Sequence, residues 1–343
     1  MAMRRPAAIV ALVFLLLFTS APFAQEKRAP EKVIEPVPLP VLSIRLCDSP
    51  PRIDGRLRER CWREAAAADL QFRVGGGKPE QPAFALLCCD DKALYIAARL
   101  TEPNEPASRY IRRDGDFSGQ DTFEVFVDIG AGALYYYRLV VNPANARLDE
   151  RCMTATGLHD PSWNGAWESA TVVEKGMWTA ELAIPWSDLK LYFRKGYVIG
   201  LNLCRRRAAT GELCTWSPTE KSFAEPQRFG AAVLGAKIYP RHPGIRTDKI
   251  LWDPQRGLTF KMVVWDTSAI QDRVRLFHHL RLPSGRTEST LRLATLDLDT
   301  ELRYEWGPIP VEEAGQARLV VTAEKGFGTR SVFALGFDLP PKG

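Results

Sequence analysis

The chain has 343 residues and a formal net charge of +5, with 46 Lys and Arg residues scattered among 41 Asp and Glu residues. A nucleic-acid partner normally requires basic residues concentrated on one face. Outside Arg205-Arg206-Arg207 and the neighbourhood of Arg112-Arg113, the sequence has no such concentration. We therefore expect no nucleic-acid partner, and the length allows two ordinary domains.

The N-terminus has the pattern of a secretory signal peptide. Arg4 and Arg5 precede an apolar run, which is followed by T-S-A-P-F-A up to Ala24. This predicts a signal peptide over residues 1–24 with cleavage after Ala24. The apolar run is short for a bilayer span, although an uncleaved anchor is the alternative. We expect a secreted or periplasmic protein of the cell envelope, with no transmembrane segment after signal removal.

Residues 25–40 are rich in Pro, Glu and Lys, and this composition predicts an extended tether. A strand is predicted at 41–46, and a short helix from Leu57 to about Ala68. Further runs of strand composition lie at 84–89, 94–100, 122–129, 134–142, 147–154, 168–174, 178–184, 197–206, 213–216 and 229–234. Short strands at this spacing predict an all-β fold, with an antiparallel β-sandwich over residues 41–238.

Six more runs of strand composition follow between residues 246 and 340. They predict a smaller, C-terminal immunoglobulin-like β domain, with the boundary between the two domains at 239–247.

The hairpin formed by 122–129 and 134–142 carries two opposite charges on strongly β-forming runs. If it turns symmetrically about Ala131, Glu124 lies opposite Arg138. One interpretation is a cross-strand ion pair worth a few tenths to about 1 kcal/mol. The other is a carboxylate and a guanidinium on an open face, placed to bind hydroxyl groups.

Seven cysteines lie before residue 215, and an exported chain can form disulfides. Cys204 and Cys214 flank a turn and are the predicted pair, with Cys47 and Cys61 as a second candidate. The odd count leaves at least one thiol free, and buried free thiols are the alternative for all seven. No C-x-x-C is present and the four histidines do not accompany the cysteines, so no zinc site is predicted.

No motif indicates catalysis. Gly75-Gly76-Gly77-Lys78 is followed by Pro79 and therefore does not fit a P-loop. Glu124, Asp121 and Asp160 could supply the paired carboxylates of a glycosidase, but nothing specifies their separation. We expect a non-catalytic protein, at most an accessory to glycoside hydrolysis.

Seven motifs occur in the order found in carbohydrate-binding module family 9, which the chain resembles over about residues 41–235. In chain order they are I-D-G-R-L-R-E-R-C-W, D-D-K-A-L-Y-I-A-A-R-L-T-E-P, Q-D-T-F-E-V-F-V-D, W-T-A-E-L-A-I-P-W, I-G-L-N-L, W-S-P and R-F-G. The resemblance implies a β-sandwich, which is also shared with DOMON-type haem and sugar domains.

The resemblance also implies a site for saccharides. Family members hold a sugar between two Trp side chains and bind its hydroxyls with polar groups. The family's polar pair matches Glu124 and Arg138. Its first Trp falls beside Phe117, its second at Phe223, and a site Gln is replaced by Cys204.

Further expectations follow from the same resemblance. Trp163 and Trp167 could supply a substitute aromatic platform. No cofactor is certain, but family members bind calcium, for which Asp114, Asp116 and Asp160 could serve as ligands.

Two other functions remain open on the sequence. One is a haem-binding, DOMON-like electron-transfer subunit, for which Met153 or His159 could act as an axial ligand. The other is a structural or interaction protein of the cell envelope that has lost the sugar site.

Overall fold

The structure is a computed structural model that describes residues 31–130, 135–153, 156–236, 243–266, 272–296, 301–325 and 330–342. The residues from Glu31 onward belong to one compact unit. The predicted signal peptide over 1–24 and part of the predicted domain boundary lie outside the described residues, so these remain predictions.

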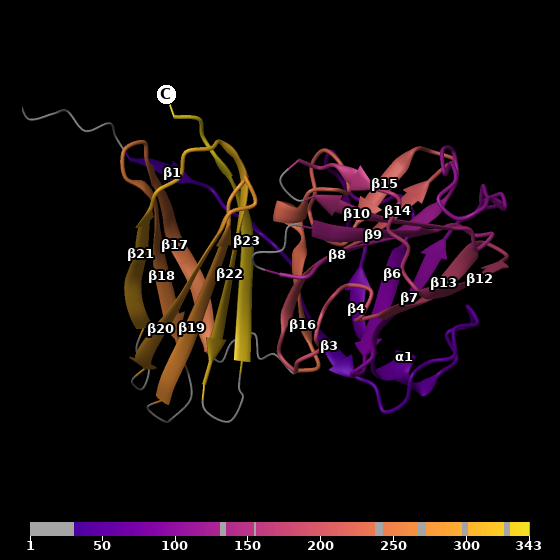
Figure 1. The fold of residues 1–343 in the computed structure, drawn as a ribbon, viewed down its shortest axis with the longest axis horizontal. Helices are drawn as coiled ribbons and strands as arrows, with labels where there is room; N and C mark the ends of the chain where they lie inside the picture. The colour runs from indigo at the N-terminus through magenta and orange to yellow at the C-terminus, as the bar shows by residue number, and fades with distance from the viewer. Residues whose placement is uncertain are drawn as a thin grey trace, which may run out of the picture. The chain divides into compact units, whose positions relative to one another are not determined.

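Residues 41–234 fold into one long sheet with the strand order β11-β10-β9-β8-β14-β16-β3-β6-β7-β13-β12, to which β4, β5 and β15 attach (Figure 1). Strand β3 pairs in parallel with both β16 and β6, whereas the other described ladders of this sheet are antiparallel. The elements are β3 (Val41–Leu46), α1 (Arg60–Glu64), β4 (Ala66–Asp69), β5 (Phe72–Arg73), β6 (Ala83–Cys89), β7 (Ala93–Thr101), β8 (Thr122–Asp128), β9 (Tyr135–Val141), β10 (Arg147–Met153), β11 (His159–Asp160), β12 (Glu168–Glu174), β13 (Met177–Pro185), β14 (Val198–Arg207), β15 (Glu212–Thr215), η1 (Pro226–Arg228) and β16 (Gly230–Leu234).

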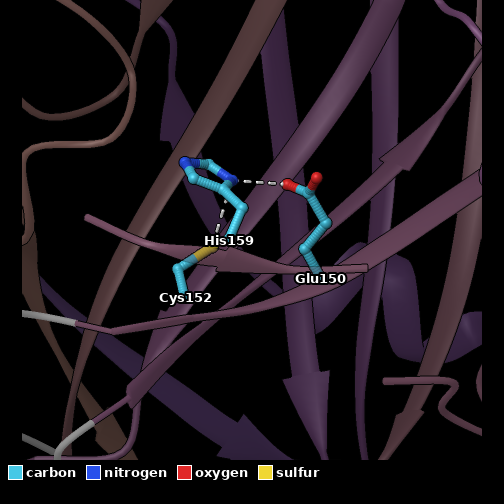
Figure 2. Close-up of side chains that lie close together, drawn as sticks. All are labelled: Glu150, Cys152 and His159. Atoms are coloured by element: carbon cyan, nitrogen blue, oxygen red, sulfur yellow. Dashed lines mark hydrogen bonds and ion pairs between the residues drawn. The ribbon is translucent and has the colours of Figure 1, made fainter. Parts of the chain in front are cut away.

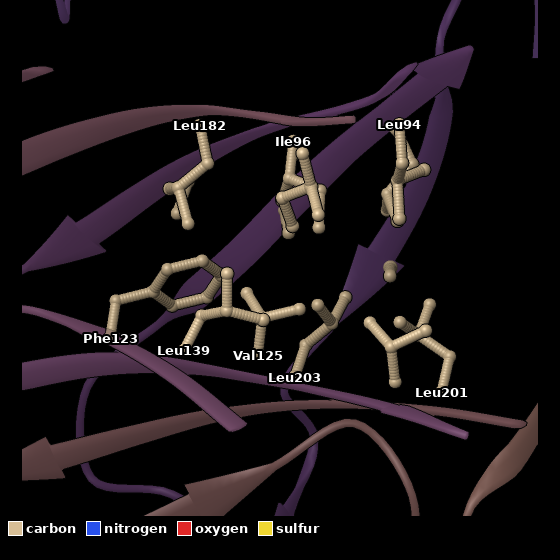
Figure 3. Close-up of a cluster of buried hydrophobic side chains, with 14 of the residues drawn as sticks. Leu94, Ile96, Phe123, Val125, Leu139, Leu182, Leu201 and Leu203 are labelled. Atoms are coloured by element: carbon tan, nitrogen blue, oxygen red, sulfur yellow. The ribbon is translucent and has the colours of Figure 1, made fainter. Parts of the chain in front are cut away.

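The core of this sandwich lies between two layers of the sheet. Figure 3 shows one row of side chains from β7 and β13, represented by Ile96 and Leu182, facing a second row from β8, β9 and β14. Phe123 and Val125 belong to the second row and are fully buried. Because a strand has a period of two, Glu124 and Phe126 point from β8 to the opposite, outer face. The antiparallel β-sandwich predicted from the sequence is confirmed.

The helix predicted from Leu57 to about Ala68 is wrong at both ends, because α1 begins only at Arg60. The helix α1 ends at Glu64, and Ala66–Asp69 forms β4 instead. β4 pairs with β6, with Ala68 opposite Ala85 and buried in the core. Pairing with the sheet therefore overrides the helix propensity of the alanine run.

The C-terminal region is also made of β-strands, in two further sheets. One has the order β1-β17-β18-β21 and the other the order β2-β23-β22-β19-β20. Both sheets contribute to one apolar core, in which Trp252, Phe260 and Phe337 are almost completely buried. The strands are β1 (Lys32–Ile34), β2 (Val37–Pro38), β17 (Gly244–Asp253), β18 (Gly257–Trp265), β19 (Asp272–Arg281), β20 (Thr287–Leu296), β21 (Glu301–Ile309), β22 (Gly315–Glu324) and β23 (Arg330–Leu339). Its immunoglobulin-like character stays a prediction.

The expected tether over 25–40 does not hold for its described part. Val33 pairs with Leu251 and Val37 pairs with Gly336, so this segment supplies an edge strand to each C-terminal sheet. Ile34 is buried in the C-terminal core. Proline is tolerated on an edge strand because one side of such a strand needs no hydrogen bond. Composition alone missed these pairings, since they are formed with residues more than 200 positions away.

None of the helices in the described ranges has the length and apolar character needed to cross a membrane.

Candidate functional site

The predicted pair of Glu124 and Arg138 meets on the outer face of β8 and β9. Arg138 Nε donates a hydrogen bond to Glu124 Oε2 over 2.9 Å. The register differs from the predicted one by two residues, because Glu124 lies opposite Val140 and Arg138 lies opposite Phe126. A shift of two residues keeps both side chains on the same face, so the pair forms along a diagonal of the ladder.

Two further side chains extend this pair across β10 and β11. Arg138 Nη1 donates to Glu150 Oε2 at 3.0 Å, and the same oxygen lies 2.8 Å from His159 Nδ1 (Figure 2). We refer to Glu124, Arg138, Glu150 and His159 as the polar row. Its side-chain exposure is 2% at Glu124, 23% at Arg138 and 40% at His159. The polar row is therefore buried at Glu124 and opens to solvent at His159.

An aromatic cluster lies under the polar row on the same outer face. Phe126 contacts Tyr136, Phe229 and Phe223, and the ring centroids of Phe126 and Phe223 are 6.4 Å apart in an edge-on arrangement. The guanidinium of Arg138 lies 5.9 Å from the centre of the Phe126 ring. The outer face thus combines charged groups with an apolar floor.

The aromatic residues proposed for the site have different positions. Phe223 belongs to the cluster and is 6% exposed. Phe117 lies half-buried in the loop before β8 and is not among the members of the cluster. Trp163 packs against the inner core, where its ring centroid lies 4.8 Å from that of Tyr137, and Trp167 is buried in that core. The two Trp residues therefore do not form a substitute platform on the outer face.

The predicted disulfide between Cys204 and Cys214 is wrong. Cys204 lies opposite Thr215, whereas Cys214 lies opposite Arg205. This offset of one residue places Cys204 in the outer aromatic cluster and Cys214 in the inner core. All seven cysteines lie in the described ranges, and all are free thiols.

Cys47 and Cys61, the second candidate pair, are not bonded to each other either. Both form hydrogen bonds with the thiol of Cys88. Burial raises the pKa of Cys61 to about 11 and also raises the pKa of Cys47.

The remaining cofactor candidates are separated by the fold. Met153 follows Cys152 on β10, and Cys152 lies directly opposite His159. Met153 and His159 therefore leave opposite faces of the hairpin and cannot hold one haem between them.

The three aspartates expected as calcium ligands have protein partners. Asp114 accepts a hydrogen bond from Asp149 N, Asp116 pairs with Arg109, and Asp160 pairs with Arg151. Calcium binding by these aspartates stays a prediction.

One convergence of metal-ligating residues was missed from the sequence. His159 Nδ1 lies 3.5 Å from Cys152 Sγ as well as 2.8 Å from Glu150 Oε2, so a histidine does accompany a cysteine in space. Burial, followed by the charge of Glu150, raises the pKa of Cys152 to about 11. The available signal was the E-x-C spacing on a strand, which places Glu150 and Cys152 on one face, followed after a turn by a histidine.

The chain is similar to solved structures of known proteins. No curated protein matches the chain. Two solved structures of a carbohydrate binding module family 9 from Caldicellulosiruptor kristjanssonii are similar to it. The complex with cellotriose is 16% identical, with a TM-score of 0.45, and the match covers 59% of this chain and 96% of that one. The complex with glucose is 17% identical, with a TM-score of 0.44, and covers 58% and 97%.

The family is shown by a family model. Residues 53–237 match the model described as "Carbohydrate family 9 binding domain-like", which spans more than half of the chain. This range contains the whole polar row and the aromatic cluster. The chain belongs to the carbohydrate family 9 binding domain-like family.

Proposed function

We propose that the chain is an exported, non-catalytic carbohydrate-binding protein that holds a saccharide on the outer face of β8, β9 and β10. The observation that carries the proposal is the polar row, which lies over the aromatic cluster. Carboxylates and a guanidinium form strong, charge-assisted hydrogen bonds to hydroxyl groups. Aromatic rings pack against the apolar C–H faces of sugars. Membership of the family supports this reading.

The exposure of the side chains suggests which groups a saccharide touches first. Glu124 and Phe223 are buried, whereas Arg138 is 23% exposed and His159 is 40% exposed at the side chain. We infer that the sugar hydroxyls bind at the Arg138 end of the polar row. Glu124 then holds the Arg138 guanidinium in place, and Phe223 contributes to the apolar floor.

The proposed role of the protein is to hold saccharides outside the cytoplasm, in support of carbohydrate catabolism. Calcium belongs to the same proposal as an optional cofactor, because the resemblance to the family implied it. Each step can be tested on the purified chain without its signal segment.

We expect calorimetry with cello-, xylo- and manno-oligosaccharides, with and without calcium, to detect binding of at least one series. Arg138→Lys should weaken that binding by about 10-fold or more. Lysine keeps the charge but loses the planar fork that binds two oxygens at once, and one charge-assisted hydrogen bond is worth roughly 1.5–3 kcal/mol. Phe223→Ala should also weaken binding, because it removes part of the apolar floor.

The matched control is Arg275→Lys in the C-terminal region, where the Arg275 side chain is 58% exposed. It should leave the affinity unchanged. A folded chain that gives no heat with any of the three series would contradict the proposal. Binding that is equally strong in Arg138→Lys and in the wild type would show that the saccharide does not bind at the polar row.

A further inference from the structure

We propose that Glu150, Cys152 and His159 form a binding site for a divalent metal ion of the zinc class. The donor atoms of these three side chains lie within 4.8 Å of one another, and no other group of this kind is found in the described part of the chain. Figure 2 shows the Glu150 carboxylate and the Cys152 sulfur both close to the His159 ring. The inference concerns a second ligand and does not depend on saccharide binding.

The backbone places the three side chains on one face without special assumptions. Cys152 and His159 are directly paired across β10 and β11, and Arg151 pairs with Asp160 beside them. Directly paired residues of an antiparallel ladder have neighbouring side chains on the same face. Glu150 precedes Cys152 by two positions and therefore shares that face.

The distances are close to those that a tetrahedral ion requires. With ordinary zinc–sulfur and zinc–nitrogen bond lengths, the two ligand atoms of a tetrahedral site are about 3.6 Å apart. Cys152 Sγ and His159 Nδ1 are 3.5 Å apart. The separation of 2.8 Å between His159 Nδ1 and Glu150 Oε2 must widen by roughly 0.6 Å. His159 can supply this movement, because its side chain is 40% exposed.

The chemistry of the donor set favours zinc over calcium or magnesium. Thiolate and imidazole ligands select borderline and soft cations, whereas calcium and magnesium prefer sets made of oxygen atoms. His159 Nδ1 is hydrogen-bonded to both Cys152 Sγ and Glu150 Oε2. A bound cation would displace the protons of these hydrogen bonds. Three protein ligands leave a fourth position open, as in zinc sites that bind a further ligand.

The surroundings of the cluster support the same assignment. Tyr136 and Cys152 are joined by a hydrogen bond, in which the Tyr136 hydroxyl can donate to a thiolate. Arg138 Nη1 donates to Glu150 Oε2, the oxygen that lies beside His159 Nδ1, and so holds this proposed ligand atom in position. With Cys152 as a thiolate, the negative charges of Glu124, Glu150 and Cys152 balance Arg138 and one divalent ion. Such outer contacts orient ligands and maintain affinity.

The test is to titrate the full mature chain, reduced and freed of metal, with Co²⁺ as a spectroscopic probe and with Zn²⁺ in calorimetry. We expect Co²⁺ to produce the near-ultraviolet charge-transfer band of a cobalt–thiolate bond, and Zn²⁺ to abolish it by competition. His159→Ala and Cys152→Ser should each remove the band and weaken Zn²⁺ binding by more than about 100-fold, because each removes a ligand. Glu150→Gln should weaken binding but retain the thiolate band.

The other thiols of the chain require a control. Cys47, Cys61 and Cys88 are hydrogen-bonded to one another through Cys88, and Cys61→Ser disrupts that group alone. His279→Ala is the matched histidine control, because His279 bonds to Ser289 in the C-terminal region. Both controls should retain the band. A band that is absent from the wild type, or that survives His159→Ala and disappears in Cys61→Ser, would overturn the assignment. His159 is exposed, so His159→Ala is expected to remain folded if Cys152→Ser does not.

Discussion

Replacing Glu102 by alanine is expected to lower the free energy of unfolding by about 3–5 kcal/mol, the usual cost of removing one partner from a buried ion pair. Glu102 follows β7 and is 1% exposed. Its Oε2 accepts hydrogen bonds from Arg205 at 3.0 Å and from Arg207 at 2.9 Å. Both arginines come from β14 and are almost completely buried. The variant would therefore leave two buried guanidinium groups without their shared carboxylate.

The measurement is urea- or heat-induced unfolding of the variant beside Glu174→Ala. Glu174 is exposed at the end of β12, so its replacement should change the free energy of unfolding by no more than about 0.5 kcal/mol. Equal stability of the two variants would show that Arg205 and Arg207 are satisfied without Glu102.

The ion pairs of Glu102 with Arg205 and Arg207 also predict that the stability of the protein depends on pH. Burial opposes ionisation of Glu102, but the hydrogen bonds and charge of Arg207 outweigh it and place the pKa of Glu102 below its ordinary value of 4.5. The unfolded chain therefore takes up this proton first as the pH falls. The stabilisation is complete above the unfolded pKa and is lost as the pH falls through the folded pKa. The stability difference between wild type and Glu102→Gln should accordingly shrink below pH 4.5.

The pairing of Arg205 and Arg207 with Glu102 also explains why the basic run at 205–207 does not form a basic surface. Arg205 and Arg207 occupy alternate positions on β14 and both point toward Glu102. Strand periodicity predicts that they share one face. It does not predict that the face is buried, because the carboxylate comes from Glu102, a residue just after β7 and about 100 positions earlier.

The strands and the Glu124–Arg138 pair could be predicted because both depend on local information. Alternating residues identify strands, and the parity of the register is enough to bring Glu124 and Arg138 to one face. The predicted register of β8 with β9 was wrong by two residues, which leaves Glu124 and Arg138 on the same face. The predicted register of β14 with β15 was wrong by one residue, which places Cys204 and Cys214 on opposite faces and prevents the predicted disulfide.

The predictions that failed concern contacts between residues distant in the sequence, or contacts whose register depends on the length of a turn. Nothing in the composition of 31–40 indicates that Val33 and Val37 complete two sheets formed by the last hundred residues. The approach of His159 to Cys152 requires the register of β10 with β11, which the turn between them sets. A different register would have separated the three donor atoms of the proposed metal site.

Glu181 provides the second large effect, because one buried carboxylate organises the I-D-G segment. Its side chain on β13 is fully buried. Oε2 accepts hydrogen bonds from Asp54 N at 2.9 Å and from Gly55 N at 2.7 Å. Oε1 accepts from Leu57 N at 3.1 Å and from Trp62 Nε1 at 2.9 Å. Three donors from the segment that leads into α1 and a fourth from Trp62 within α1 therefore converge on a single residue.

Glu181→Ala is expected to destabilise the chain by about 3 kcal/mol or more, because each buried donor left without an acceptor costs about 1–3 kcal/mol and only part of the segment can relax into water. Glu181→Gln should also destabilise it, since the amide directs N–H groups at two of the four donors. Thermal unfolding should be compared with Glu168→Ala, an exposed carboxylate on the neighbouring strand β12. If Glu181→Ala and Glu168→Ala unfold at the same temperature, the I-D-G segment is held by packing of Trp62 instead of by the carboxylate. If only the Glu181 variants lose stability, the family motif I-D-G followed by W is explained as the set of donors that one buried glutamate requires.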